Sequence, residues 1–198
     1  MTSEFKKLLD GKRLVLASTS PRRSEILKAA KMDFEVIFPE NIKEEEISDD
    51  PVFHVLELSR KKAESVSQKV KDGFILGADT IVVLNKEILG KPKDQVDAFR
   101  ILKKLSGKEH KVYTGITLLD IKNGKISSDY QLTKVKFNQL KDKEIEDYIK
   151  TGEPMDKAGA YGIQGMGNFL VEKIDGDLDN VIGLPMKKLK ELLLKIKS

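Results

Sequence analysis

The sequence contains no cysteine, no tryptophan and only two histidines, His54 and His110, among its 198 residues. Without thiolates there is no disulfide framework, no cysteine-ligated zinc site and no cysteine nucleophile. Two histidines also disfavour a multi-histidine metal centre or a Ser-His-Asp triad. The chemistry of the chain must therefore use carboxylates, hydroxyls, lysines, arginines and, where a metal takes part, a hard cation, which favours reactions on phosphates.

The sequence also lacks the apolar run of about 18 residues that a membrane-spanning helix needs. Residues 1–12 carry Phe5, Leu8 and Leu9 among charged residues, and they do not form the continuous apolar segment of a secretory signal. Charge of one sign forms no block, because 36 Lys and Arg are interleaved with 32 Asp and Glu and leave a net charge of +4. We therefore expect a cytoplasmic protein that binds neither membranes nor nucleic acid, with a pI near 9.0 as the one argument for nucleic-acid binding.

Strand and helix patterns alternate along most of the chain. Apolar runs and alternating apolar residues predict strands over 13–17, 34–38, 74–84 and 87–89, and a hairpin over 112–121 and 126–137 with Asn123 and Gly124 in a type I′ turn. Apolar residues three and four apart predict helices over 22–31, 51–71, 94–105, 142–150 and 185–197. Ser20 is the expected cap of the first of these helices. We expect a single domain over 1–198 of the α/β class, with a mixed, twisted sheet and flanking helices, and two lobes around a cleft are compatible with it.

Hydroxyl and guanidinium groups are concentrated where the first predicted strand meets the first predicted helix, in Ser18, Thr19, Ser20, Arg22 and Arg23. Cations are unfavourable in the first turn of a helix because the macrodipole is positive there, and a bound anion would reconcile them with that position. Hydroxyls, free backbone N–H groups and guanidiniums are the partners that a polyphosphate needs. A serine-rich cap beside two solvated arginines explains the same residues equally well.

A single carboxylate, Asp79, interrupts the apolar run over 74–84. A buried carboxylate must be paired, bound to a metal or shifted in pKa, and the small residues Gly77 and Ala78 leave room for a ligand beside it. An aspartate bonded to a neighbouring loop is the less favoured alternative. Three further charged residues could reach a phosphate or a metal but are individually no different from solvated surface residues: Lys62, Lys91 and Glu40.

Four glycines fall within nine residues of a segment that follows Lys157, at positions 159, 162, 165 and 167. Their order fits neither the dinucleotide-binding G-x-G-x-x-G pattern nor a Walker A loop. Gln164 lies among them, and its amide offers both a donor and an acceptor, which suits the edge of a nucleic-acid base. A purely structural glycine turn is the alternative.

Five separated motifs, taken together, closely resemble those of the Maf family of nucleoside triphosphate pyrophosphatases: LASTSPRR at 16–23, GADT at 77–80, LGKP at 89–92, YTG at 113–115 and KAGAYGIQG at 157–165. The resemblance extends in order from residue 13 to Pro185 and leaves residues 1–12 as an N-terminal extension. It implies a fold like that of the inosine triphosphate pyrophosphatases, a homodimer and a divalent cation, Mg²⁺ or Mn²⁺. It also implies an enzyme that cleaves a nucleoside triphosphate between the α and β phosphates, giving the monophosphate and pyrophosphate.

The resemblance also implies roles for single residues. Asp79 matches the family's proton acceptor, and we expect it to activate water for attack on the α-phosphorus. The implied catalytic residues are Asp79, Lys62 and Lys91, the implied substrate-binding residues are Ser18, Arg22, Arg23, Thr80 and Gln164, and the implied metal ligands are Glu40 and Asp79.

Three of these residues relate to which nucleoside triphosphate is the substrate. Arg22, Thr80 and Gln164 resemble the branch that acts on dTTP and UTP, whereas the 7-methylguanosine triphosphate branch typically has Trp, Gln and Glu there. Lys134 departs from an acidic residue that is frequent in the family. Two alternatives stay open at this point: a pyrophosphatase specific for modified nucleotides, and a non-catalytic regulator of septum formation that arrests cell division.

Overall fold

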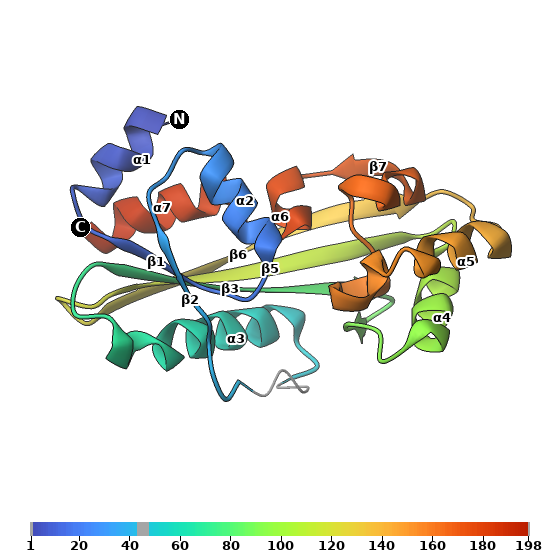
Figure 1. Cartoon of the computed structure of the whole chain (residues 1–198), viewed down its shortest axis with the longest axis horizontal. Helices are drawn as coiled ribbons and strands as arrows, with labels where there is room; N and C mark the ends of the chain where they lie inside the picture. The colour runs from blue at the N-terminus through green and yellow to red at the C-terminus, as the bar shows by residue number, and fades with distance from the viewer. Residues whose placement is uncertain (1, 43–47, 198) are drawn as a thin grey trace. The chain divides into compact units, whose positions relative to one another are not determined.

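The structure, a computed structural model, describes residues 2–42 and 48–197. Its strands form one mixed seven-stranded sheet in the order β2-β1-β3-β5-β6-β7, with β4 paired to β3 (Figure 1). β1 is parallel to both β2 and β3, whereas β4 is antiparallel to β3 and β7 is antiparallel to β6. The strands are β1 Leu14–Ala17, β2 Glu35–Ile37, β3 Phe74–Leu84, β4 Glu87–Leu89, β5 Glu109–Asp120, β6 Lys125–Phe137 and β7 Val171–Asp175.

Helices accompany the sheet, so the α/β class with a mixed sheet and flanking helices is confirmed. The α-helices are α1 Thr2–Leu9, α2 Pro21–Ala29, α3 Pro51–Ser65, α4 Gln95–Leu105, α5 Asp142–Lys150, α6 Leu178–Ile182 and α7 Met186–Lys197. Short 3-10 turns are η1 Ser67–Lys69, η2 Glu153–Asp156, η3 Ala158–Ala160 and η4 Gly165–Leu170. Not one helix among residues 2–42 and 48–197 is long and apolar enough to cross a membrane.

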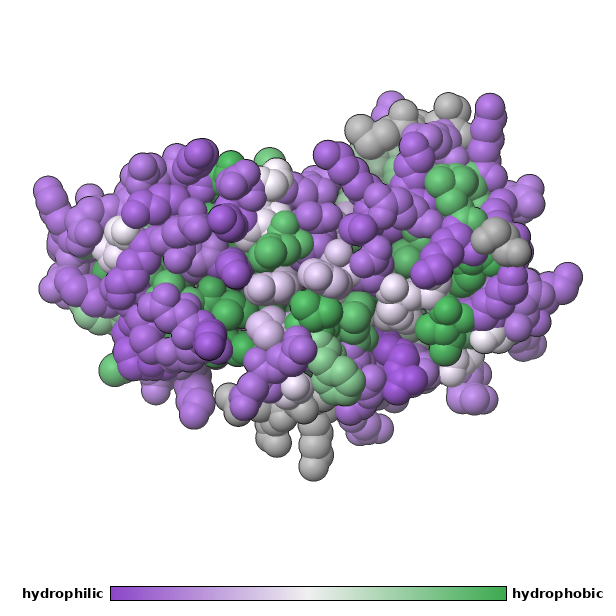
Figure 2. Space-filling view, turned by 180° about the vertical axis from the view of Figure 1, so that it is seen from behind, coloured by the Kyte–Doolittle hydropathy of each residue, from purple (hydrophilic) through white to green (hydrophobic). Residues whose placement is uncertain are grey.

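The chain divides into two compact units. Unit 1 consists of Met1–Asp79, Thr114–Gln131 and Gly183–Ser198, and unit 2 of Thr80–Tyr113 and Leu132–Ile182. In unit 1, α3 and strands β1 and β3 bury a core of small aliphatic side chains, among them Val15, Ala63 and Ile75. In unit 2, α4 and α5 lie side by side (Figure 1) over a larger core that includes Phe137 and Tyr161. Hydrophilic residues predominate on the face shown in Figure 2, where apolar residues form small separate patches.

Two expectations about local structure are wrong. The predicted helix over 51–71 ends at Ser65 and is followed by η1, because the hydroxyls of Ser65 and Ser67 bond back to the carbonyls of Lys62 and Glu64 and compete with helical hydrogen bonds. The hairpin between β5 and β6 has a four-residue turn in place of a type I′ turn, since only Gly124 of the central pair has a positive φ. Asp120 stabilises that turn by accepting hydrogen bonds from the backbone N–H of Lys122 and the amide of Asn123.

Candidate active site

Two predicted site residues of unit 1, Ser18 and Asp79, lie where the parallel strands β1 and β3 end their pairing. Ala17, the last residue of β1, is opposite Gly77 of β3. Ser18 and Asp79 therefore lie one and two residues beyond the last paired positions, at the same edge of the sheet. Parallel strands in a sheet are about 4.8 Å apart, so this register brings the two side chains into one neighbourhood.

Helix α3 packs on β3 at backbone distance because Gly77 has no side chain. A Cβ at Gly77 would lie 2.1 Å from the carbonyl oxygen of Ser59. Gly77 and Asp79 are two residues apart on a strand and therefore face the same side, the side that α3 covers. The contact brings Lys62, one turn after Ser59, within reach of Asp79, and the Nζ–Oδ1 distance is 2.8 Å.

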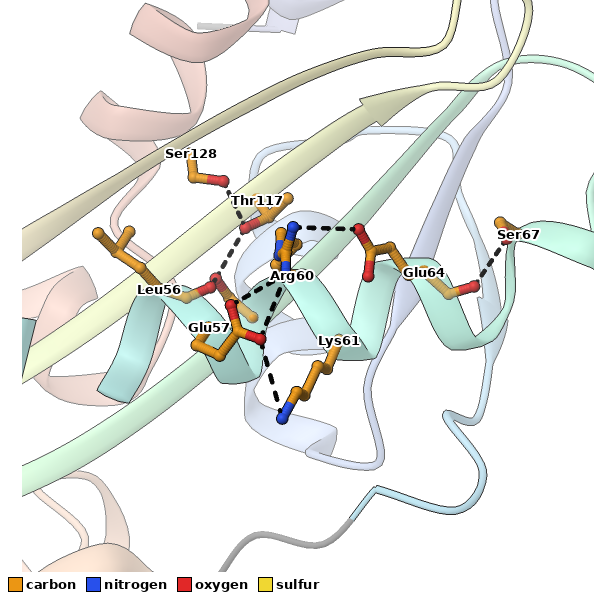
Figure 3. Close-up of polar contacts among 9 residues, drawn as sticks. Leu56, Glu57, Arg60, Lys61, Glu64, Ser67, Thr117 and Ser128 are labelled. Atoms are coloured by element: carbon orange, nitrogen blue, oxygen red, sulfur yellow. Dashed lines mark hydrogen bonds and ion pairs between the residues drawn. The ribbon is translucent and has the colours of Figure 1, made fainter. Parts of the chain in front are cut away.

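Hydrogen bonds fix the position of α3 further. The Ser59 hydroxyl bonds to the Leu56 carbonyl and to the Thr117 hydroxyl of β5, both at 2.8 Å, and Thr117 bonds to Ser128 of β6 at 2.8 Å (Figure 3). The exposed side of the helix carries ion pairs among Glu57, Arg60, Lys61 and Glu64 (Figure 3). Such exposed pairs contribute about 0.3–0.5 kcal/mol each, so the buried contacts decide where α3 lies.

The pair formed by Lys62 and Asp79 is buried, with side chains 7% and 9% exposed. Burying an ion costs several kcal/mol even after relaxation, and a well-packed apolar pair of similar volume is often as stable or more so. Stability alone therefore does not require these two charges. The arrangement instead keeps a carboxylate and an ammonium ready in a site with little water, where each interacts strongly with a charged ligand.

The strand-to-helix turn after β1 is held by Arg23. Arg23 donates from Nη1 to the Ser18 hydroxyl at 3.0 Å and from Nε to the Gly183 carbonyl at 2.8 Å, and it is buried. Ser20 occupies the predicted N-cap position of α2, but its side chain makes no capping hydrogen bond. The Ser18 hydroxyl instead accepts a hydrogen bond from the Ser20 N–H. Arg22 is half-buried in the first turn of α2. A buried guanidinium, a hydroxyl and a helix N-terminus thus meet at one turn, which suits a phosphate.

The two predicted metal ligands have different partners in the structure. Glu40 is exposed and pairs with Lys69 at 2.6 Å, whereas Asp79 pairs with Lys62. Within residues 2–42 and 48–197, no group of three or more His, Cys, Asp or Glu side chains is placed to hold a metal. Carboxylate oxygens nevertheless suit Mg²⁺, which is typically held by one or two protein carboxylates together with water and substrate phosphates. The donor chemistry therefore fits a cation that arrives with a polyphosphate.

The other three predicted residues, Thr80, Lys91 and Gln164, belong to unit 2. Thr80 follows Asp79 on β3 and is half-buried, while Lys91 and Gln164 are exposed. The turn that carries Lys91 and the glycine-rich segment are joined by a backbone hydrogen bond of 3.0 Å from the Gly159 N–H to the Gly90 carbonyl. Unit 2 thus brings the segments of Lys91 and Gln164 together.

Two residues that bind the glycine-rich segment were not singled out from the sequence. Tyr148 of α5 accepts a hydrogen bond from the Gly162 N–H at 3.0 Å, and Glu153 accepts one from the Met166 N–H at 3.1 Å. A buried tyrosine on an amphipathic helix just before a glycine-rich segment was the available signal. Helical periodicity explains that tyrosine as a core residue, and nothing in the residue pattern assigns it a further contact.

The fold and site define an α/β protein with a buried lysine–aspartate pair and a strand-to-helix turn suited to anions. Residues 13–196 match the family described as Maf-like protein, and the chain belongs to that family. Three similar proteins are each named dTTP/UTP pyrophosphatase. They come from Clostridium botulinum (strain Okra / Type B1; 48% identical over 190 residues, 93% of this chain and 97% of that protein), Thermoanaerobacter sp. (strain X514; 51% over 182, 91% and 95%) and Carboxydothermus hydrogenoformans (50% over 177, 89% and 95%).

The solved structures are less similar to this chain than these three proteins are. A nucleoside-triphosphatase / dITP/XTP pyrophosphatase from Mycobacterium abscessus has a TM-score of 0.41 at 12% identity, covering 65% of this chain and 74% of that one. The Staphylococcus aureus Ham1 protein has a TM-score of 0.44 at 14% identity, covering 66% and 74%. The membership of the chain in the family rests on the sequence matches alone.

Proposed function

We propose that this protein is an enzyme that hydrolyses nucleoside triphosphates, dTTP and UTP foremost, between the α and β phosphates. The names of relatives that are 47–51% identical over nine-tenths of the chain support the substrate. The observation that carries the proposal is the buried ion pair of Lys62 and Asp79 at 2.8 Å, next to the Ser18–Arg23 turn. A buried carboxylate and several cations are what water attack on a polyphosphate requires.

In this proposal Asp79 accepts a proton from the water whose oxygen forms the new bond to the α-phosphorus. The bond between that phosphorus and the oxygen bridging to the β-phosphate breaks, and pyrophosphate leaves. Lys62 and Lys91 neutralise the charge that builds up on the phosphates, and Ser18, Arg22 and Arg23 hold them. Thr80 and Gln164 contact the base.

A divalent cation, Mg²⁺ or Mn²⁺, belongs to the proposal, with Glu40 and Asp79 as its protein ligands. When bound it would neutralise phosphate charge and polarise the phosphoryl oxygens. We also propose a homodimer, which the resemblance to the Maf family implies, and a cytoplasmic location, because nucleoside triphosphate pools lie inside the cell.

The test is hydrolysis of dTTP, UTP, CTP, ATP, GTP and 7-methyl-GTP with Mg²⁺ or Mn²⁺, scoring pyrophosphate against orthophosphate. Pyrophosphate release from dTTP and UTP is expected, and Asp79→Asn should lower kcat by about 100-fold or more, the usual range for a general base. Asp120→Asn is the matched control, because Asp120 is also a buried aspartate of unit 1 paired with a lysine, Lys12, at 2.8 Å. Asp120→Asn should retain kcat.

Other results would contradict the proposal. Orthophosphate as the product would exclude cleavage between the α and β phosphates. An unchanged kcat in Asp79→Asn would remove this residue from the reaction. No turnover of any nucleotide with either metal would leave a binding role, such as regulation of septum formation, and preference for a modified nucleotide would change the substrate.

A further inference from the structure

Two backbone hydrogen bonds hold the segment that carries Gln164, one from Gly162 and one from Met166, each two residues away from Gln164. The Gly162 N–H donates to the Tyr148 hydroxyl at 3.0 Å, and the Met166 N–H donates to Glu153 Oε2 at 3.1 Å. The two acceptors are themselves joined, because the Tyr148 hydroxyl donates to Glu153 Oε1 at 3.1 Å. A loop of five residues with Gln164 at its middle therefore rests on one hydrogen-bonded pair of side chains.

We infer that Tyr148 and Glu153 are positioning residues that set nucleotide selectivity by fixing the loop of Gln164. This inference rests on the proposed function, in which Gln164 contacts the base. It adds two residues that touch no substrate and act through the backbone on either side of Gln164.

Tyr148 is a rigid support for the loop. Its side chain is buried in the core of unit 2 with Ile145 and Ile149 of the same helix. Burial raises the pKa of the Tyr148 hydroxyl, so the group stays protonated over the physiological range. A neutral hydroxyl can donate one hydrogen bond and accept another, which matches its bonds to Glu153 and Gly162.

Glu153 is held by its own backbone as well as by Tyr148. Its N–H donates to the Thr151 hydroxyl at 3.1 Å, and its carbonyl accepts from the Lys157 ammonium. The carboxylate accepts at both oxygens, one from Tyr148 and one from Met166. Both contacts are donors to the Glu153 carboxylate, so replacing this side chain with that of alanine removes both acceptors at once.

Two glycines of the segment, Gly165 and Gly167, are explained by this contact. A Cβ at Gly167 would lie 2.2 Å from the Gly162 carbonyl oxygen and 2.7 Å from the Tyr148 hydroxyl. At Gly165, φ is +71° and a Cβ would lie 3.2 Å from Glu153 Oε2. The glycines therefore let the loop fold against the pair of side chains, and no contact between a glycine and a ligand is needed to explain them.

The chemistry of the base explains why fixing the loop matters. Thymine and uracil present an N–H donor between two carbonyl acceptors, and cytosine presents a different order of donors and acceptors. An exposed glutamine amide can turn to suit either pattern, so discrimination depends on holding the amide at a fixed place, within about 0.5 Å, relative to the base. A loop released from Tyr148 or Glu153 loses that restraint.

The experiment compares Tyr148→Phe and Glu153→Ala with the wild type in two measurements. Steady-state kinetics on dTTP, UTP and CTP should show the ratio of kcat/KM for dTTP over CTP falling by about tenfold, mainly through a higher KM for dTTP. Hydrogen exchange should become faster at the Gly162 amide in Tyr148→Phe and at the Met166 amide in Glu153→Ala.

Tyr161→Phe is the matched control. Tyr161 is also a buried tyrosine of unit 2, but its hydroxyl bonds to Nε2 of His110 at 2.8 Å. Removing that hydroxyl leaves the hydrogen bonds of the Gly162 and Met166 amides unchanged. The Tyr161→Phe variant should be less stable than the wild type and should keep the ratio of kcat/KM for dTTP over CTP unchanged. Equal loss of selectivity in Tyr161→Phe, or unchanged selectivity in both test variants, would overturn the positioning role. Absence of hydrolysis in the wild type would instead overturn the proposed function itself.

Discussion

His110 is the buried group that most clearly links the stability of this protein to pH. Burial lowers its pKa to about 4, because its surroundings are the rings of Phe137 and Tyr161. In the unfolded chain the same histidine titrates near 6.5. The folded state therefore holds a neutral imidazole while the unfolded state takes up a proton below about pH 6.5, so stability falls as the pH is lowered through this window.

We predict that His110 alone removes about 2 kcal/mol from the free energy of unfolding between pH 7 and pH 5. Urea unfolding at both pH values measures it, with His110→Gln as the comparison because its amide can still meet the Tyr161 hydroxyl and does not titrate. The variant should lose less stability over the same interval. An equal loss in both proteins would show that other groups cause the acid sensitivity.

The geometry of the candidate site was predictable from the sequence only where a single residue carries a signal. Asp79 stood out because a carboxylate in an apolar strand must have a partner, and its partner is Lys62. The partner itself was not predictable from the residues, because periodicity places Lys62 beside an apolar stripe without saying which strand that stripe covers. Glu153 was less predictable still, since its two contacts depend on the conformation of a loop that no periodic pattern describes.

At the scale of the element, the position of α3 depends on two glycines. A Cβ at Gly77 would meet the Ser59 carbonyl at 2.1 Å, and one at Gly115 of β5 would meet the Val55 carbonyl at 2.4 Å. Both contacts are with backbone, which cannot rotate away as a side chain can. The helix must therefore move as a whole if either glycine gains a side chain.

We predict that Gly77→Ala lowers the free energy of unfolding by about 1–3 kcal/mol, the usual cost of overpacking, and also lowers kcat because α3 carries Lys62 away from Asp79. Chemical denaturation and dTTP hydrolysis measure the two effects. Gly90→Ala is the control for stability, since a Cβ there meets nothing within 4 Å. A fully stable Gly77→Ala protein would mean that α3 has room that the structure does not show.

Elements with a strong period were predictable, and elements held by contacts distant in sequence were not. The long strand over 74–84 and the helix α4 follow from their apolar patterns. β7 has the mixed burial of a sheet edge, with its residues intermediate or exposed, and α6 is only five residues long. Their local patterns are too weak to predict them, because pairing with β6 and packing in unit 2 stabilise them.

At the scale of the whole molecule, the two ends of the chain are joined within unit 1. Helix α1, which lies before the region matched by the family, packs side by side with the last helix, α7 (Figure 1). Phe5 and Leu9 of α1 are buried, and Glu4 pairs with Lys190 of α7 at 2.5 Å. The N-terminal extension is thus part of the core of unit 1, an outcome that its short and highly charged sequence did not indicate.

The Phe5→Ala variant tests how much α1 contributes to the stability of the protein. Removing a buried phenylalanine side chain typically costs about 3–5 kcal/mol, but α1 can also detach, so the loss in Phe5→Ala is limited to the free energy with which the helix docks. We predict a loss of about 3 kcal/mol in the free energy of unfolding, with dTTP hydrolysis retained at 25 °C because Lys62 and Asp79 lie on other elements.

Leu194→Ala is the control, since Leu194 is on α7 but 53% exposed, and it should cost under about 0.5 kcal/mol. Because detachment leaves the rest of unit 1 folded, faster hydrogen exchange in α1 and α7 alone would identify docking as the limit, whereas faster exchange throughout the unit would show that α1 stabilises its whole core.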